Sequence, residues 1–121
     1  MKDPKANSTI AQANELFEYA EQELSRPAED VVGYLVCHNA YKSIDKYLSA
    51  FLMENGHHLN ASTSIENMLN ECRLIDPRFK ELNLDVLYKT KVKEDVYMDM
   101  TTVRHYMSMA SQTRKLISNS N

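Results

Sequence analysis

The segment Tyr34–Phe51, with the sequence YLVCHNAYKSIDKYLSAF, carries apolar side chains at alternating steps of three and four residues. That spacing places them on one side of an α-helix, where they face a partner helix. The stripe consists of Tyr34, Cys37, Tyr41, Ile44, Leu48 and Phe51. The spacing recurs in two further sets: Ile10, Ala13, Phe17, Ala20 and Leu24, then Val96, Met100, Val103, Met107 and Ala110. Three such stripes must pack against one another, so the sequence predicts an all-α, up-and-down bundle of four or five helices.

Capping residues predict where the first two helices of the chain begin and end. The first helix is expected to start at a cap formed by Asn7 or Ser8 and to run to about residue 25. The second is expected over residues 27–55, because Pro27 suits a first helical turn and Gly56 suits a left-handed C-cap. Gly33 weakens the start of this helix and permits the close approach of another backbone.

The second half of the chain predicts shorter elements followed by a final long helix. Thr63 and Glu66 have the spacing of a capping box for a short helix over residues 65–73. Asp76-Pro77 predicts a new helical turn, with the aspartate as cap. Leu84, Val86 and Leu87 are apolar but set no helical period, and the last helix is expected over residues 94–117. Short connections between successive helices predict antiparallel neighbours.

Composition indicates a single domain that spans residues 1–121. The chain has 121 residues, 43% of them hydrophobic, and a formal net charge of −3, so a nucleic-acid partner would need a local basic patch. Cys37 and Cys72 are the only cysteines, and neither belongs to a CxxC pair, which predicts no zinc site and no cofactor. We find no apolar run of membrane length and no signal peptide at the start, so we expect a cytoplasmic protein.

Residues 45–52 and the glycine that follows them resemble the HEPN family of small prokaryotic helical bundles. The matching pattern is Asp45-Lys46, Leu48, Ala50, Leu52 and then Gly56, where the family has a Glu-Lys, Leu, Lys-Ala, Leu, Gly run on its second helix. The family's Thr-His-Asp-Leu step into a short helix corresponds here to residues 62–65, which read Ser-Thr-Ser-Ile and lack the histidine.

The resemblance implies a bundle that homodimerises and that pairs with a minimal nucleotidyltransferase, as in toxin–antitoxin pairs. Other members of the family are ribonucleases, with an arginine four to six residues before a histidine near the start of the last helix. No arginine has that spacing here, since Arg104 is adjacent to His105 and points about 100° away on a helix. The resemblance therefore favours the bundle and argues against the family's usual nuclease.

A basic connection ahead of the last helix is the best candidate for a nucleotide or RNA contact. Its cations are Lys89, Lys91 and Lys93, to which Arg104 adds a fourth. Such cations near a helix N-terminus are able to hold a phosphate, and Tyr97 is able to stack on a base. The alternative is a solvated loop whose charge is balanced by Glu94, Asp95 and Asp99.

The remaining polar residues each have a structural interpretation as well as a functional one. Asp45 and Lys46 either shape a groove of the nucleotide site or form the polar face of the second helix. His57 and His58 resemble metal ligands but lack a third partner in sequence, so exposed loop histidines are the better interpretation. His38 is interpreted as hydrogen-bonded packing within its helix.

Methionines around the last helix predict a homodimer. Met98, Met100, Met107 and Met109 fall on more than one face, and one chain is not expected to bury every face. The leading functional hypothesis is a non-catalytic, HEPN-like interaction module that contacts a nucleotide. One alternative is a divergent, metal-independent ribonuclease that uses Arg104, His105 and Tyr97 in a dimer cleft. The other is a structural homodimer without a ligand.

Overall fold

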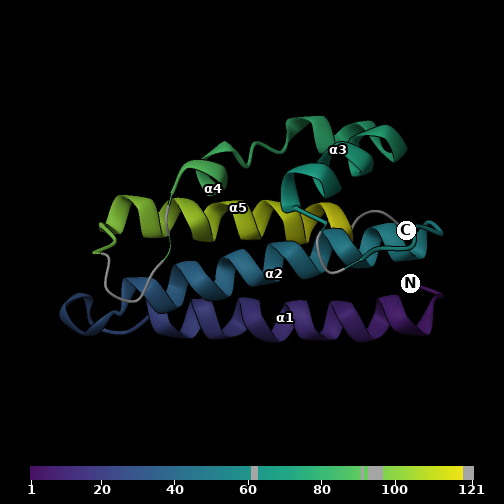
Figure 1. Ribbon diagram of the computed structural model, residues 1–121. Coiled ribbons are helices and arrows are strands. Elements are labelled where there is room, and N and C mark those ends of the chain that lie inside the picture. The colour runs from purple at the N-terminus through teal and green to yellow at the C-terminus, as the bar shows by residue number, and fades with distance from the viewer. Residues whose placement is uncertain (61–62, 91, 93–96, 119–121) are drawn as a thin grey trace.

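All regular structure in the described part of the chain is helical. The computed structural model describes residues 1–60, 63–90, 92 and 97–118. In chain order the elements are α1 (Pro4–Leu24), η1 (Ala28–Asp30), α2 (Gly33–Glu54), α3 (Ile65–Ile75), η2 (Pro77–Glu81), α4 (Asp85–Lys89) and α5 (Met100–Ser118), where η marks a 3₁₀ helix. Three long helices lie side by side, and the short elements cover one side of α2 and α5 (Figure 1). This confirms the prediction of an all-α bundle.

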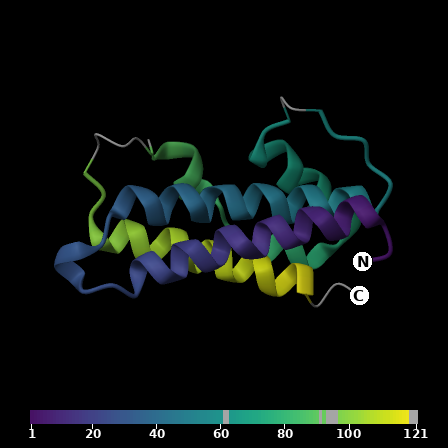
Figure 2. The same ribbon diagram turned by 90° about the horizontal axis from the view of Figure 1, so that it is seen from below.

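The long helices follow an alternating order when the short elements between α2 and α5 are counted as one return pass. α1 and α2 are antiparallel, whereas α5 runs in the same direction as α2 in both ribbon views (Figures 1 and 2). The start of α2 meets the start of α5, because an added Cβ on Gly33 would lie 3.1 Å from Val103 Cγ2. α2 and α5 are parallel because α3, η2 and α4, which lie between them in the chain, return it to the end where α2 began.

The contact between α1 and α2 is built on small side chains at heptad spacing. Ala6, Ala13 and Ala20 are fully buried at intervals of seven residues along α1. On α2, Ala40 and Tyr47 are likewise buried, and the Tyr47 hydroxyl donates a hydrogen bond to the Asn14 side-chain oxygen of α1. Small residues at this spacing let two helices approach closely over a long contact. α2 is therefore the central helix, packed on α1 on one side and on α5 and α3 on others.

The first helix begins earlier than expected. Asp3 Oδ1 accepts hydrogen bonds from the backbone N–H groups of Lys5 at 2.8 Å and Ala6 at 3.3 Å, and Pro4 occupies the first turn. The predicted caps Asn7 and Ser8 are both inside α1 and exposed. Asp-Pro is a stronger start signal than a lone Asn or Ser, because the carboxylate caps the N–H groups while proline presets the helical φ.

The expected start of α2 at Pro27 was also wrong. Pro27 has an extended backbone, with ψ of 140°, and precedes only the single 3₁₀ turn of η1. Val31 and Val32 then remain extended, and the Val32 N–H donates to Glu23 Oε2 at 2.9 Å. Because β-branched valines favour extended backbone and this N–H already has an acceptor, the helix begins at Gly33 instead. At its other end, Gly56 has a φ of +82° and confirms the predicted left-handed C-cap.

We call the part of the chain from α3 to α4, residues 65–89, the return segment. It agrees in outline with the prediction from the sequence, but its capping residues differ. Ser64, not Thr63, caps α3, because Ser64 Oγ accepts from the Asn67 N–H at 3.1 Å, and the helix runs to Ile75 rather than Arg73. Asp76 caps η2 as predicted. The apolar run after it contains the short helix α4, which the sequence did not predict because five residues are too few to reveal a period.

The last helix begins later than expected. Glu94 and Asp95, its predicted first residues, lie outside the described part of the chain, and residues 97–99 are not helical. Asp99 caps the helix, since its carboxylate accepts from the Thr102 backbone N–H at 2.9 Å and from the Thr102 hydroxyl at 3.1 Å. Within the described residues, no helix is sufficiently long and apolar to cross a bilayer.

Replacing Glu54 with glutamine is expected to lower the melting temperature at neutral pH. The Glu54 carboxylate accepts hydrogen bonds from the backbone N–H groups of Lys2 at 2.8 Å and Asp3 at 2.9 Å, and these bonds lower its pKa. A carboxyl group with a lowered pKa stabilises the fold above its ordinary pKa, and that contribution is lost as the pH falls through the folded value. Melting curves measured across the acidic range test this.

The matched control for this change is Glu71→Gln, which removes the same charge from an exposed position on α3. We expect the acid-induced loss of stability to be shallower in the Glu54 variant than in the wild type or in the Glu71 variant. Identical pH dependence in all three proteins would show that the Glu54 carboxylate does not hold the N-terminus to the end of α2.

Candidate functional site

The strongest candidate site is a groove of about 310 Å³ between α2 and the segment around α4. Its α2 side consists of His38, Tyr41 and Lys42, which fall on one helix face at steps of three and four residues. The opposite side consists of Leu87, Thr90 and Val92. We refer to this hollow as the α2–α4 groove. It combines apolar side chains with a few polar groups that converge on one space, which is the usual make-up of small-molecule sites.

Aromatic rings stand beside and within the α2–α4 groove. Tyr41 of α2 and Tyr88 of α4 are 40% and 39% exposed, and they lie close enough for Tyr41 to raise the pKa of the Tyr88 hydroxyl slightly, in addition to the larger effect of burial. The His38 ring stacks on Tyr34, with 5.3 Å between centroids and 21° between planes. This stack holds the imidazole against the helix. Partly exposed rings held in this way offer flat surfaces to a planar ligand.

Charges of both signs lie around the groove, since Glu66 and Asp85, in addition to burial, raise the pKa of the neighbouring Tyr88 hydroxyl. Lys42 lines the groove, and Lys89 ends α4 next to the groove residue Thr90. Asp45 follows Lys42 by three residues on α2. Its partial burial raises its pKa, while the charges of Lys46 and Lys42 oppose that shift. An anionic group would therefore bind near Lys42 and away from Asp45.

A buried hydroxyl lies beneath this groove. Tyr106 of α5 is fully buried, and its hydroxyl has no hydrogen-bond partner within the described residues. Burial raises the pKa of this hydroxyl, and the nearby Thr90 side chain, which also lines the groove, opposes that shift. Cys37 and Tyr41 are close as well. An unpaired buried hydroxyl costs free energy, so this position is unusual within an otherwise apolar core.

The structure does not bring the described members of the predicted nucleotide-binding set together at one hollow. Lys89 and Asp45 belong to the neighbourhood of the α2–α4 groove. Lys46 lines a different hollow on the side of α1, together with Gln12, Glu15, Leu16 and Tyr19, so it does not share a groove with Asp45. Lys91 and Lys93 lie outside the described residues. Asp45 and Lys46 face different sides of α2, because adjacent residues of a helix point about 100° apart.

The structure does not gather the residues of the alternative catalytic set into a recognisable site. Arg104 and His105 are both exposed, on successive positions of α5. Tyr97 is 87% exposed and lines a hollow beside η1 and the start of α2, together with Tyr34 and Met100. Tyr97 therefore borders a hollow formed with the α1–α2 connection. Arg104 and His105, which come later in the chain, lie on the exposed surface of α5.

The two thiols and the histidines do not form a reactive or metal-binding centre in the part of the chain described. Burial raises the pKa of both Cys37 and Cys72 to about 12, so each thiol is protonated at neutral pH and is not a nucleophile. The described residues contain no group of three His, Cys, Asp or Glu side chains placed to hold a metal ion. His38 stacks on Tyr34, where hydrogen-bonded packing had been expected, and it also lines the groove, which the sequence interpretation did not anticipate.

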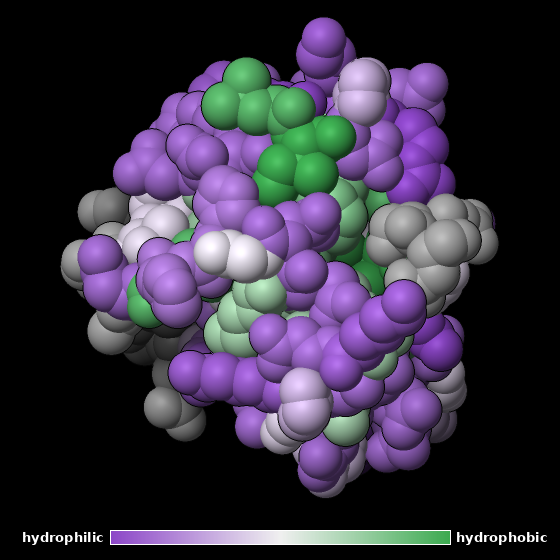
Figure 3. All heavy atoms as spheres, turned by 90° about the vertical axis from the view of Figure 1, so that its right-hand side faces the viewer, coloured by the Kyte–Doolittle hydropathy of each residue, from purple (hydrophilic) through white to green (hydrophobic). Residues whose placement is uncertain are grey.

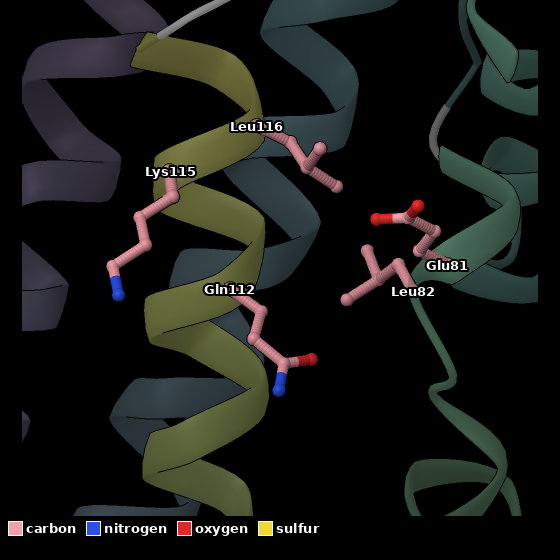
Figure 4. A pocket seen from close by; sticks show the side chains of 5 residues that line it. All are labelled: Glu81, Leu82, Gln112, Lys115 and Leu116. Atoms are coloured by element: carbon pink, nitrogen blue, oxygen red, sulfur yellow. The ribbon is translucent and has the colours of Figure 1, made fainter. Parts of the chain in front are cut away.

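A second hollow lies between η2 and α5, but its lining residues are less suited to binding a ligand than those of the α2–α4 groove. Figure 4 shows Leu82 and Leu116 facing each other across it, while the charged end of Lys115 points away from Glu81. An apolar patch also interrupts the largely hydrophilic end of the molecule in Figure 3. Leu74 of α3 is 81% exposed. Neither feature brings cations and rings together as the α2–α4 groove does.

The methionines do not support the argument that led to the homodimer. Met98 and Met109 are buried within one chain, and Met100 and Met107 are partly buried. A single chain therefore covers the faces that were expected to need a partner, because Met98 precedes α5 and packs against the start of α2. The homodimer stays a prediction, which a light-scattering measurement of the molar mass at micromolar concentration tests.

Comparison with known proteins found no matching family model, no matching curated protein and no matching solved structure.

Sequence reasoning missed the groove because it assigned its residues to other roles. Tyr41 was placed in the buried stripe of α2, but it is 40% exposed and lines the groove. The signal was present in the spacing of His38, Tyr41 and Lys42, which puts an imidazole, a phenol and an ammonium group on one face. What the sequence could not supply was the opposite wall, because α4 was not predicted.

Proposed function

We propose that this chain is a non-catalytic, HEPN-like binding module that holds a nucleoside monophosphate in the α2–α4 groove. One observation carries the proposal: Tyr41, His38 and Lys42 line a single hollow together with Thr90. A nucleotide offers the matching groups, namely a flat ring to stack, polar edges to hydrogen-bond and a phosphate for a cation. No reacting group is assigned to the site.

The size and charge of the groove narrow the class of ligand. A volume of about 310 Å³ is at the lower end of the range for small-molecule sites. It therefore favours a mononucleotide over a larger dinucleotide cofactor. Lys42 is the cation among the described residues that line the groove, so the phosphate is placed near Lys42 and the base near Tyr41.

Reversing the charge of Lys42 is expected to weaken nucleotide binding by about tenfold or more. The Lys42→Glu variant replaces the cation with a carboxylate that repels the phosphate, while leaving the groove's rings in place. The measurement is calorimetric titration with AMP, GMP, CMP and UMP, at low ionic strength so that screening does not mask the effect.

The matched control is Lys46→Glu, which makes the same charge change one turn further along α2 but in the hollow on the α1 side. This variant is expected to bind as the wild type does. The proposal fails if the wild type binds none of the four nucleotides, and it also fails if Lys42→Glu and Lys46→Glu bind them equally.

A protein partner is proposed on the resemblance alone. If the chain belongs to the HEPN class, its partner is a minimal nucleotidyltransferase, and co-purification of the two proteins tests that idea. The divergent ribonuclease stays a prediction, since Arg104 and His105 are exposed without a described hollow shared with Tyr97. Incubation of the protein with labelled RNA and EDTA, with His105→Ala as the comparison, tests it.

A further inference from the structure

The hollow that Tyr97 borders has a volume of about 340 Å³ and lies where η1 and the start of α2 meet the residues that precede α5. We call it the η1–α5 hollow, and its lining includes Glu29, Val31, Val32, Tyr34, Tyr97 and Met98. No described residue lines both this hollow and the α2–α4 groove, so the two are separate. Its volume is sufficient for a small ligand.

The charge of the η1–α5 hollow comes from one carboxylate. Glu29 is the one charged residue among the described residues that line it, and none of them donates a hydrogen bond to Glu29 or forms an ion pair with it. Glu23, near the end of α1, differs: it pairs with Arg26 at 3.0 Å and accepts from the Val32 N–H at 2.9 Å. The Glu29 carboxylate is therefore available to a ligand, and it favours a cation over an anion.

Two phenol rings border the same hollow. Tyr97 is 87% exposed, and the ring of Tyr34 is held in place by its stack on His38, with 5.3 Å between centroids. The face of an aromatic ring attracts a cation through its quadrupole. The rings and the carboxylate thus favour the same sign of charge by two different effects.

The rest of the lining is apolar and selects the kind of cation. Val31 and Val32 line the hollow, and Met98 is packed so closely on the start of α2 that a Cβ on Gly33 would lie 3.1 Å from Met98 Cβ. Such a surface gains from covering an alkyl chain but not from a bare ion. The described part of the chain also holds no group of three side chains able to ligate a metal. An amine on an apolar stem fits every part of this lining.

We propose that the η1–α5 hollow binds an alkylammonium group, that is, an ammonium cation carried on a short apolar chain. The ammonium lies between the Glu29 carboxylate and the two tyrosine rings, and the chain lies on the valines and Met98. This site is independent of the proposed nucleotide site. A free polyamine and a lysine side chain of another protein share this chemistry.

The test compares butylammonium with 1-butanol, which has nearly the same shape but no charge. Binding is followed by methyl NMR at low ionic strength, so that screening does not mask the effect of charge. The methyl signals of Met98 and Met100, which both line the hollow, are expected to shift and saturate, while that of Met53, at the other end of α2, stays in place. Butylammonium is expected to bind about threefold or more tightly than 1-butanol.

Two variants with matched controls test the assigned groups. Glu29→Gln is expected to weaken butylammonium about two- to fivefold and to leave 1-butanol unchanged, whereas Asp30→Asn, the same charge change at the next exposed position, binds as the wild type does. Tyr97→Leu is expected to weaken butylammonium about two- to fivefold, with Tyr88→Leu on α4 as its control. All four positions are exposed, so the fold is expected to tolerate these changes.

The proposal is overturned if butylammonium binds no more tightly than 1-butanol, or if Glu29→Gln and Asp30→Asn bind it equally. Spermidine and a lysine capped at both ends then distinguish the two sources. Tighter binding of spermidine supports a free polyamine, and tighter binding of the capped lysine supports the side chain of another protein. Failure of the wild type to bind either of them would also overturn the proposal. Lys42→Glu is expected to change none of these results, because Lys42 lines the other groove.

Discussion

Replacing Phe79 with alanine is expected to lower the free energy of unfolding by about 3–5 kcal/mol, the usual cost of truncating a buried phenylalanine. Phe79 is fully buried and is the one buried residue of η2. Its ring packs on Phe51 of α2, with 4.8 Å between the centroids. A 3₁₀ helix of five residues has little stability of its own, so this contact holds the return segment against the long helices.

The polar contacts around Phe79 do not compensate for the stability that is lost with its ring. Arg73 of α3 donates to the Leu82 carbonyl at 2.7 Å and to the Phe79 carbonyl at 3.3 Å, which ties η2 to α3 rather than to α2. The expected change is measured by urea denaturation, and hydrogen exchange should rise in α3 and η2 before it rises in α1. Lys80→Ala, at the exposed neighbouring position, is the control and should change stability little. A loss below about 1 kcal/mol for Phe79→Ala would contradict this view of the return segment.

Replacing Gly33 with valine is expected to destabilise the fold by about 3 kcal/mol, at the upper end of what overpacking costs. A Cβ on Gly33 would already lie 3.1 Å from Met98 Cβ and from Val103 Cγ2, and 3.2 Å from the Met98 carbonyl oxygen. The two additional methyl groups of valine leave no room for α5 to keep its position. This close approach confirms the role that the sequence assigned to Gly33.

The control for Gly33→Val is Leu35→Val, which places a β-branched residue in the same turn of α2 at a partly exposed position. It should cost only the small helix-propensity difference, about 0.5 kcal/mol. Denaturation curves of both variants give the comparison. Equal losses for the two would mean that helix propensity, and not the contact with α5, explains the effect at Gly33.

The long helices could be predicted from the sequence because their apolar periods extend over several turns. Cys37, Ile44, Leu48 and Phe51 of the predicted stripe are all buried. Tyr41 departs from the pattern because α2 contacts different partners along its length, and the groove opens where α4 stands away from it. Periodicity reports which side of a helix is apolar, but it does not report which of its positions are left uncovered.

The helix ends were predicted less accurately, because several residues near one end were each able to act as the helix cap. The Asp-Pro pair that correctly placed η2 at Asp76 also occurs at Asp3, where α1 begins, but Asn7 and Ser8 were preferred there. In the candidate site, Lys89 was predicted as a nucleotide contact, whereas the groove residue Thr90 and the buried Tyr106 near it were not anticipated. Their importance depends on the packing of α4 against α2 and α5, which no local pattern encodes.

The shared direction of α2 and α5 has a consequence for how the chain reaches its native state. α1 and α2 are joined by a short connection, so they can pair early, as a local hairpin. α5 can join them only after residues 55–99 have closed into a loop, and that closure carries an entropic cost. The groove therefore forms late, because one wall belongs to α2 and the other, Leu87, Thr90 and Val92, lies within this loop. On a ribosome, a nascent chain would hold a preformed helical pair while its ligand site is still unassembled.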